Sequence, residues 1–213
     1  MIKLVSMGEK MRYKYRSVDN IDILKTYMND PYYKSWYRIV RKILKNKEFQ
    51  KRRLFVHHEN ESLWTHSIKV SFNSYKLAIK LGVNAYNCAI AGLLHDFYTR
   101  AWQDNIELTL LDDKYRDRFI NPKKEKLFEK HGFSHPKEAL YNSRLYFKKY
   151  MNKNIENAIV THMFPLSLFT NNKMPNCKES IIISFVDKKV SLNVLNSFST
   201  ILKYVGLLKK ELN

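Results

Sequence analysis

The chain has 213 residues, 45% of them hydrophobic, a length and composition that suit one globular domain with an added segment. No apolar run reaches the roughly 18 residues needed to cross a bilayer, and the N-terminal apolar stretch is too short for a signal peptide. We therefore expect a cytoplasmic protein with no membrane partner. The two cysteines, Cys88 and Cys177, lie far apart and predict no disulfide framework.

The net charge of +18 would attract polyanions, including phosphorylated small molecules and nucleic acid. The densest basic stretch runs from Arg38 to Arg53, where cations alternate with apolar residues at helical spacing. This pattern favours a solvated helix face, and a face that binds nucleic acid or phosphate is the alternative. A nucleic-acid partner therefore stays open but is not the favoured interpretation.

Five glycines and five prolines in the whole chain leave few turns, and strand-type alternation is scarce, so the sequence predicts an all-α fold. Residues 1–20 show no clear period. Helices are predicted at about 21–29 and, after Pro31, at about 32–49. We expect residues 1–50 to form a helical N-terminal extension that caps a domain of residues 51–213.

The next helix is predicted at 62–81, with Ser62 as its N-cap and Gly82 at its end, and its apolar stripe includes His66. His57 and His58 precede it in a polar stretch that we expect to be an exposed loop. A helix over 85–94, capped by Asn84, is apolar almost all round, as expected of a helix in the middle of a bundle.

Residues 99–134 form a charged segment without an amphipathic period, which predicts a lid or specificity loop or, alternatively, a solvated excursion. Pro136 predicts the start of a helix that continues through Phe147. His162 follows at helical spacing near the end of another helix, before Pro165. Ser180 is expected to cap the last helix.

The pair His95-Asp96 closes the apolar helix 85–94 with two metal-capable side chains. Adjacent helical positions point about 100° apart, so one ion rarely takes both residues unless the helix is ending or a second ion is present. Further ligands would come from His66, His135, His162 and Asp187, all on or beside segments with helical periodicity. An ionised Asp187 on an apolar helix face needs a cation nearby.

The segments Ala-Gly-Leu-Leu-His-Asp at 91–96 and His-Pro-Lys at 135–137, in this order with the other histidines and the late Asp187, carry a family resemblance. From about Leu54 to Leu195 the chain resembles the HD-domain metal-dependent phosphohydrolase superfamily, especially its small single-domain bacterial members. The resemblance implies an HD-domain helical bundle.

The resemblance also implies a site with two divalent metal ions. His66, His95, Asp96 and Asp187 would hold one ion, and Asp96 would bridge to a second held by His135 and His162, with Asp96 and His95 central to catalysis. A hydroxide on the metals would attack phosphorus in a phosphorylated small molecule, for which a nucleotide or dinucleotide is favoured. Such ligands favour iron or manganese, with zinc, cobalt, nickel and magnesium as alternatives.

One departure concerns the group that binds phosphate. Many family members follow the His-Asp pair with Gly-Lys, whereas this chain continues Phe97-Tyr98-Thr99-Arg100. The candidate substrate-binding residues are therefore Arg100, Lys137 and Lys188, with His131 and His58 as further contacts, and ordinary surface charge is the alternative for the cations. His131 could also replace His135 as a ligand.

Two other functions fit the same residues. Some relatives with a six-ligand His-Asp site are di-iron oxygenases, which oxidise C–H bonds with oxygen. A metal-stabilised nucleotide-binding or regulatory module would bind its ligand without turnover.

Overall fold

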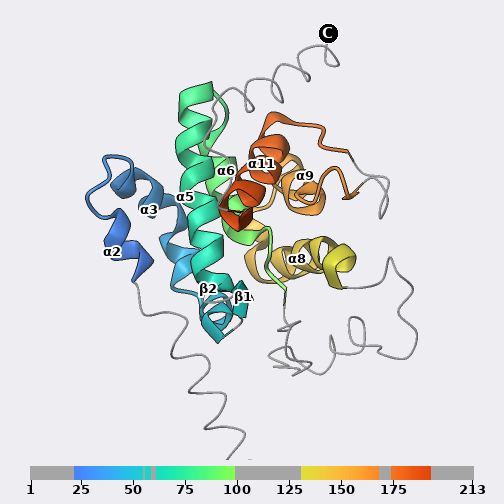
Figure 1. The fold of residues 1–213 in the computed structure, drawn as a ribbon, viewed down its shortest axis with the longest axis horizontal. Helices are drawn as coiled ribbons and strands as arrows, with labels where there is room; N and C mark the ends of the chain where they lie inside the picture. The colour runs from blue at the N-terminus through green and yellow to red at the C-terminus, as the bar shows by residue number, and fades with distance from the viewer. Residues whose placement is uncertain (1–21, 55, 59–60, 99–130, 168–173, 193–213) are drawn as a thin grey trace, which may run out of the picture.

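A computed structural model describes residues 22–54, 56–58, 61–98, 131–167 and 174–192. Over these ranges the chain is almost entirely helical, which confirms the predicted all-α fold (Figure 1). Within the described ranges no helix is both long and apolar enough to span a membrane. The elements in chain order are α2 (Ile23–Tyr27), α3 (Tyr33–Leu44), α4 (Lys47–Gln50), η1 (Lys51–Leu54), β1 (Val56–His58), β2 (Glu61–Ser62), α5 (Leu63–Leu81), α6 (Ala85–Leu94), α8 (His131–Phe147), η4 (Lys148–Tyr150), α9 (Lys153–Thr161) and α11 (Lys178–Leu192).

The two central helices begin and end at the residues that the sequence indicates. The Ser62 hydroxyl accepts a hydrogen bond from the Thr65 amide at 3.1 Å and caps α5. Gly82 ends α5 with φ 64°, a left-handed conformation that only glycine adopts without strain. Asn84 caps α6 by accepting from the Asn87 amide at 3.0 Å. The predicted bounds of both helices are confirmed.

Helix α6 lies inside the bundle, where α5, α3, α9 and α11 pack around it (Figure 1). Helices α5 and α6 approach each other closely at Gly92, where an added Cβ would lie only 2.8 Å from the Cα of Ser71. Beside this contact the Ser71 hydroxyl donates to the Ala89 carbonyl at 2.7 Å. The glycine therefore lets α6 press against α5 one turn before His95, and this close contact fixes where the helix end points.

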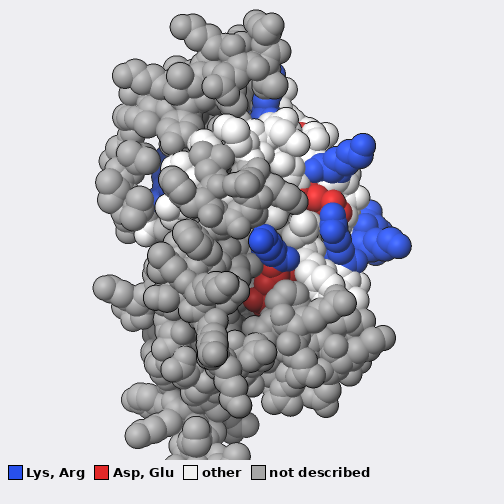
Figure 2. All heavy atoms as spheres, turned by 90° about the vertical axis from the view of Figure 1, so that its right-hand side faces the viewer, with Lys and Arg blue, Asp and Glu red and all other residues white. Residues whose placement is uncertain are grey.

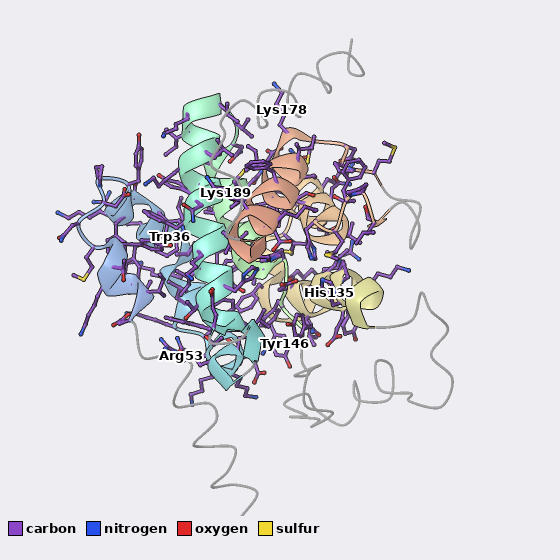
Figure 3. All side chains as sticks on the ribbon, viewed as in Figure 1. Trp36, Arg53, His135, Tyr146, Lys178 and Lys189 are labelled. Carbon is purple, nitrogen blue, oxygen red and sulfur yellow. The ribbon has the colours of Figure 1, made fainter. Side chains whose placement is uncertain are left out.

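Helix α3 joins the same core. Trp36 is fully buried between α3 and α5, and its indole N–H donates to the Ser71 hydroxyl at 2.9 Å (Figure 3). Val40, Ile43 and Leu44 are buried on the same side of α3. The described part of the N-terminal extension thus packs into the bundle, while the division at residue 50 stays a prediction.

The stretch after α3 differs from the predicted helix over 32–49. The helix ends at Leu44, and Asn46 starts α4 anew by accepting a hydrogen bond from the Glu48 amide at 2.8 Å. Asparagine competes with the helical backbone for hydrogen bonds and favours N-cap positions, which explains the break. The expected loop around His57 and His58 is also wrong, because β1 pairs antiparallel with β2.

Two predicted helix starts are wrong as well. Helix α8 begins at His131, so Pro136 lies inside it, where proline keeps a helical φ and forgoes one backbone hydrogen bond. Helix α11 begins at Lys178, so Ser180 is not its cap. The Ser180 hydroxyl instead donates to Asn157 Oδ1 at 2.5 Å and ties α11 to α9.

Candidate metal centre

The adjacent His95 and Asp96 point into one buried cluster because α6 ends there. His95 is the C-cap of α6, and Asp96 lies just beyond the last helical residue. Asp96 Oδ2 lies 3.3 Å from His95 Nε2, so the two neighbours share a target that successive positions of a continuing helix would not reach. This is the helix-end condition that the sequence requires for both residues to serve one site.

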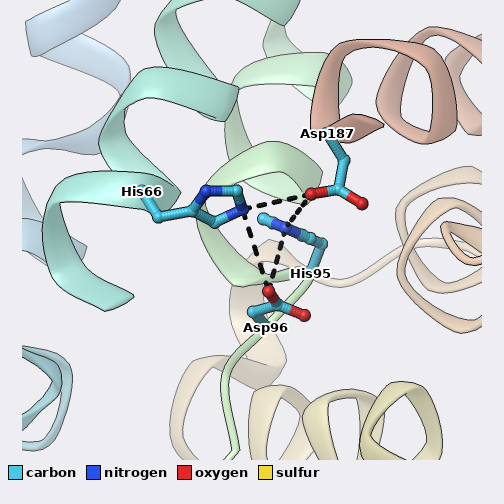
Figure 4. Close-up of side chains that lie close together, drawn as sticks. All are labelled: His66, His95, Asp96 and Asp187. Atoms are coloured by element: carbon cyan, nitrogen blue, oxygen red, sulfur yellow. Dashed lines mark hydrogen bonds and ion pairs between the residues drawn. The ribbon is translucent and has the colours of Figure 1, made fainter. Parts of the chain in front are cut away.

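The first donor group consists of His66 from α5, His95 and Asp96 from the end of α6, and Asp187 from α11 (Figure 4). Asp187 Oδ1 lies 3.1 Å from His66 Nε2 and 3.3 Å from His95 Nε2. Asp96 Oδ2 lies 3.9 Å from His66 Nε2. One donor atom from each residue thus lies within 4.8 Å of the others, although residues 66 and 187 are far apart in the chain.

The second donor group uses the other oxygen of the same aspartate. Asp96 Oδ1 lies 3.3 Å from both His135 Nε2 and His162 Nε2, and these two nitrogens are 3.0 Å apart. His135 comes from α8, and His162 follows the end of α9. Asp96 therefore links the first group and the second group through its two carboxylate oxygens.

Hydrogen bonds on the far side of two imidazole rings determine which nitrogen faces the cluster with a lone pair. His95 Nδ1 donates to the Gly92 carbonyl and His162 Nδ1 donates to the Ile159 carbonyl, each at 2.8 Å. A carbonyl only accepts, so the neutral form of each ring has its lone pair on Nε2. Metal-binding histidines are commonly oriented by such a bond to the other ring nitrogen.

These lone pairs face other acceptors. His95 Nε2 is buried with two carboxylate oxygens 3.3 Å away, so either a proton or a metal ion must lie between these atoms. Two ligands bound about 2.1 Å from one ion at roughly 90–105° lie about 3.0–3.3 Å apart. The distances within both groups fall mostly in that range, and nitrogen with carboxylate oxygen suits transition metals better than calcium. The residues fit a metal centre.

The charges of the cluster point the same way. Burial alone would raise the pKa of Asp96, but His95, His135 and His162 hold it well below its usual value. Burial likewise opposes ionisation of Asp187, and His66 and His95 hold its pKa well below the usual range. Two ionised carboxylates in a buried cluster need compensating positive charge, which a metal ion provides.

A second layer holds the chain where it leaves Asp96. The Asn142 side chain donates to the Phe97 carbonyl at 2.9 Å, and the Arg52 guanidinium lies 4.0 Å from the Phe97 ring centre. Tyr98 is buried, with its ring 5.9 Å from the ring of His135. Arg52 is 1% exposed, so this member of the basic stretch does not lie on a solvated face. Periodicity alone gives no signal for this buried arginine.

The candidate substrate-binding residues are placed unequally. Lys137 is exposed on α8, two positions after His135. Lys188 donates at 3.1 Å to the His162 carbonyl, at 3.2 Å to the Ser184 carbonyl and at 2.8 Å to the Ser184 hydroxyl. These bonds use all three N–H groups of the lysine, so in this conformation it joins α11 to the end of α9.

The remaining candidates lie at or beyond the limits of the described structure. Arg100 and most of the predicted lid over 99–134 lie outside the described residues. His131 is the first residue of α8, and His58 belongs to β1, but their side chains are outside the description. Their roles stay predictions.

Comparison with known families assigns the chain to a class. The family model of the HD domain matches residues 63–190, more than half of the chain and all six residues of the two donor groups. The protein therefore belongs to the HD domain family, whose fold is that of metal-dependent hydrolases. Searches of curated proteins and of solved structures find no match.

Proposed function

We propose that this protein is a phosphohydrolase with two divalent transition-metal ions. The main support is the position of Asp96, which has one carboxylate oxygen in each donor group. His66, His95, Asp96 and Asp187 would hold one ion, and Asp96, His135 and His162 the other. Bound ions of this kind neutralise phosphoryl oxygens and lower the pKa of a water to about 7. Iron and manganese suit the mixed nitrogen and oxygen donors best.

The roles of the protein groups follow from their contacts. The Asp96 carboxylate has one oxygen in each group, so it would hold both ions. The backbone bonds of His95 and His162 keep the Nε2 lone pairs on the cluster. Asp187 adds the second carboxylate, which lets the first group balance more positive charge than the second. Preorganised groups of this sort contribute most where water is excluded.

Substrate would approach from the side of His135 and Asp187. Their side chains keep 9% and 10% of their surface exposed, whereas those of His66 and His95 are fully covered. Among the candidate cations that the structure describes, Lys137 is the exposed one; it leaves α8 about 200° round the helix from His135, so it would meet a phosphate only at the outer part of a bound substrate. A phosphorylated small molecule, with nucleotides and dinucleotides first, is the substrate class that we propose.

The test combines metal analysis with a hydrolysis screen of the full chain. The purified protein should contain or require transition metal and should release phosphate or nucleotide from members of a panel of p-nitrophenyl phosphates, nucleotides, dinucleoside polyphosphates and cyclic phosphodiesters. Lys137→Ala should raise KM about fivefold with little change in kcat, whereas the exposed Lys153→Ala serves as the matched control.

Protein that stays metal-free and inert after reconstitution with iron, manganese, cobalt and zinc would refute the proposal. Oxygen consumption with an organic substrate would replace it with the oxygenase alternative. Tight nucleotide binding without product over hours would replace it with the binding-module alternative.

A further inference from the structure

Helix α3 carries a row of exposed cations along one side. Lys34, Arg38, Arg41 and Lys45 follow one another at spacings of four, three and four residues, which places them on one face over three turns. All four are exposed, and the opposite side of the helix is buried through Trp36 and its neighbours. The row is about 16 Å long at 1.5 Å per residue.

The row contains no negative charge to balance it. Helix α3 has no Asp or Glu, and within the described ranges none of the four cations forms an ion pair. Carboxylates on either side are already used, since Asp30 pairs with Lys76 at 2.5 Å and Glu48 with Lys51 at 2.6 Å.

The face shown in Figure 2, on the side of the molecule away from α3, has Lys and Arg beside Asp and Glu. Like charges at i and i+4 destabilise a helix, so the unbalanced row of α3 costs folding free energy. A helix face that only contacts water gains nothing from a row of unpaired cations. A polyanion bound to the row would remove the repulsion between the cations.

Two aromatic rings lie beside the row. Tyr33 and Tyr37 are partly exposed, and their rings stack with centroids 5.5 Å apart and planes 18° apart. Tyr37 lies one helical turn from Arg41, on the edge where the basic face meets the core. Proteins that bind single-stranded nucleic acid combine a positive track for the backbone with aromatic rings on which bases stack.

We propose that the exposed face of α3 binds single-stranded nucleic acid, with Lys34, Arg38, Arg41 and Lys45 contacting phosphates and the Tyr33–Tyr37 pair stacking on a base. The row, about 16 Å long, is long enough to contact the phosphates of a few successive nucleotides. This surface is separate from the metal centre, so the inference does not depend on the proposed phosphohydrolase activity.

The test is the binding of a fluorescein-labelled twelve-nucleotide oligouridylate, followed by anisotropy, with the full chain and EDTA to exclude metal-dependent hydrolysis. Arg38→Gln/Arg41→Gln/Lys45→Gln keeps the helix propensity and removes three charges. The control Lys153→Gln/Lys178→Gln/Lys189→Gln removes three exposed charges on α9 and α11 instead, and Figure 3 labels Lys178 and Lys189.

At about 0.15 M salt the α3 variant should bind at least about tenfold more weakly than the wild type, and its salt slope should fall by about 2, since each lost contact removes about 0.7. The control should keep the wild-type slope. Tyr37→Leu, which keeps an apolar side chain in place, should weaken binding about fivefold or more. Circular dichroism checks that each variant keeps its helix content.

Three results would overturn the inference. Equal weakening by the two triple variants would mean that net charge alone attracts the oligonucleotide. If the wild type did not bind the oligonucleotide at about 0.15 M salt, α3 would not be a nucleic-acid-binding surface. Binding of anionic phosphatidylserine vesicles through α3, with no binding of the oligonucleotide, would assign the face to membranes.

Discussion

The first and second donor groups share Asp96 but differ in charge and in the pKa of one histidine each, His95 in the first group and His162 in the second. In the first group, burial would lower the pKa of His95, but Asp96 and Asp187 raise it to about 10. In the second group, burial lowers the pKa of His162 despite its bond to Asp96. The first group contains one more carboxylate, Asp187, which helps to raise the pKa of His95, so the first group favours positive charge more strongly.

This difference implies unequal metal affinity. An ion in the first group meets two carboxylates and two imidazoles, whereas an ion in the second meets one shared carboxylate and two imidazoles. We therefore expect the first ion to bind more tightly and the second to depend on Asp96 being held in place.

Asp96→Asn should remove both ions, because it takes the shared negative charge from both groups. Activity should fall by more than about a hundredfold, since even the outer partners of metal ligands are worth 10- to 100-fold. Metal content by mass spectrometry and phosphate release are the measurements. The control Glu156→Gln removes a carboxylate that pairs with Arg144 outside the site, and it should change neither. Two retained ions in Asp96→Asn would contradict the bridging role.

Asp187→Asn should weaken the tighter ion selectively, because the first group then has no more carboxylates than the second. We expect its Kd to rise at least about tenfold, which brings the two affinities closer together. Titration with a metal-sensitive dye measures both sites at once. If the weaker ion were lost first and the tighter one unchanged, the assignment of Asp187 to the first group would be wrong.

His162→Ala should remove only the weaker ion, because His162 Nε2 belongs to the second group alone. Metal content should fall from about two ions per chain to about one, and the Kd of the remaining ion should change by less than about threefold. A loss of both ions, in a variant whose helix content is intact, would show that the groups do not bind independently.

Arg52→Met should have the smallest effect on the metals and a clear effect on folding. The guanidinium is buried over Phe97 and donates to the Glu48 carbonyl at 2.6 Å, so its loss should lower the free energy of unfolding by about 2–3 kcal/mol. The neighbouring Arg53, which is half-buried over the Trp64 ring at 3.4 Å, is a matched control, and Arg53→Met should lower it by about 1 kcal/mol.

Denaturant unfolding measures both arginine variants, and a metal titration should show an affinity about threefold lower in Arg52→Met alone, a smaller loss than that in Asp187→Asn. Equal unfolding free energies for Arg52→Met and Arg53→Met would mean that the contact with Phe97 does not hold the chain beyond Asp96.

Local signals predicted the helices best. Ser62, Gly82 and Asn84 mark the ends of α5 and α6 because their hydrogen bonds and backbone angles involve residues only a few positions away. Asn46 carries the same kind of signal, but the apolar period across it extended the predicted helix too far. A single local signal, such as a capping residue, therefore predicts where a helix ends. Where a capping residue and an apolar period disagree, the sequence does not show which one prevails.

Long-range contacts were beyond sequence reasoning. Ser180 is predicted to cap α11, but its hydroxyl bonds Asn157 of α9 instead. Lys188 is predicted to bind phosphate, but its N–H groups are used in hydrogen bonds to Ser184 and His162. The buried Arg52 depends on Phe97, far along the chain. Family resemblance carries such long-range information and indicates all six donor residues, whereas the distances between them and the use of both Asp96 oxygens come from the fold alone.

The most direct test of the central claim is an anomalous difference map from crystals of the full chain loaded with manganese. We predict two peaks, one within about 2.0–2.5 Å of each oxygen of the Asp96 carboxylate, with the stronger peak among His66, His95 and Asp187. A map without a peak at Asp96, or with a single ion bound by neither His135 nor His162, would contradict the account.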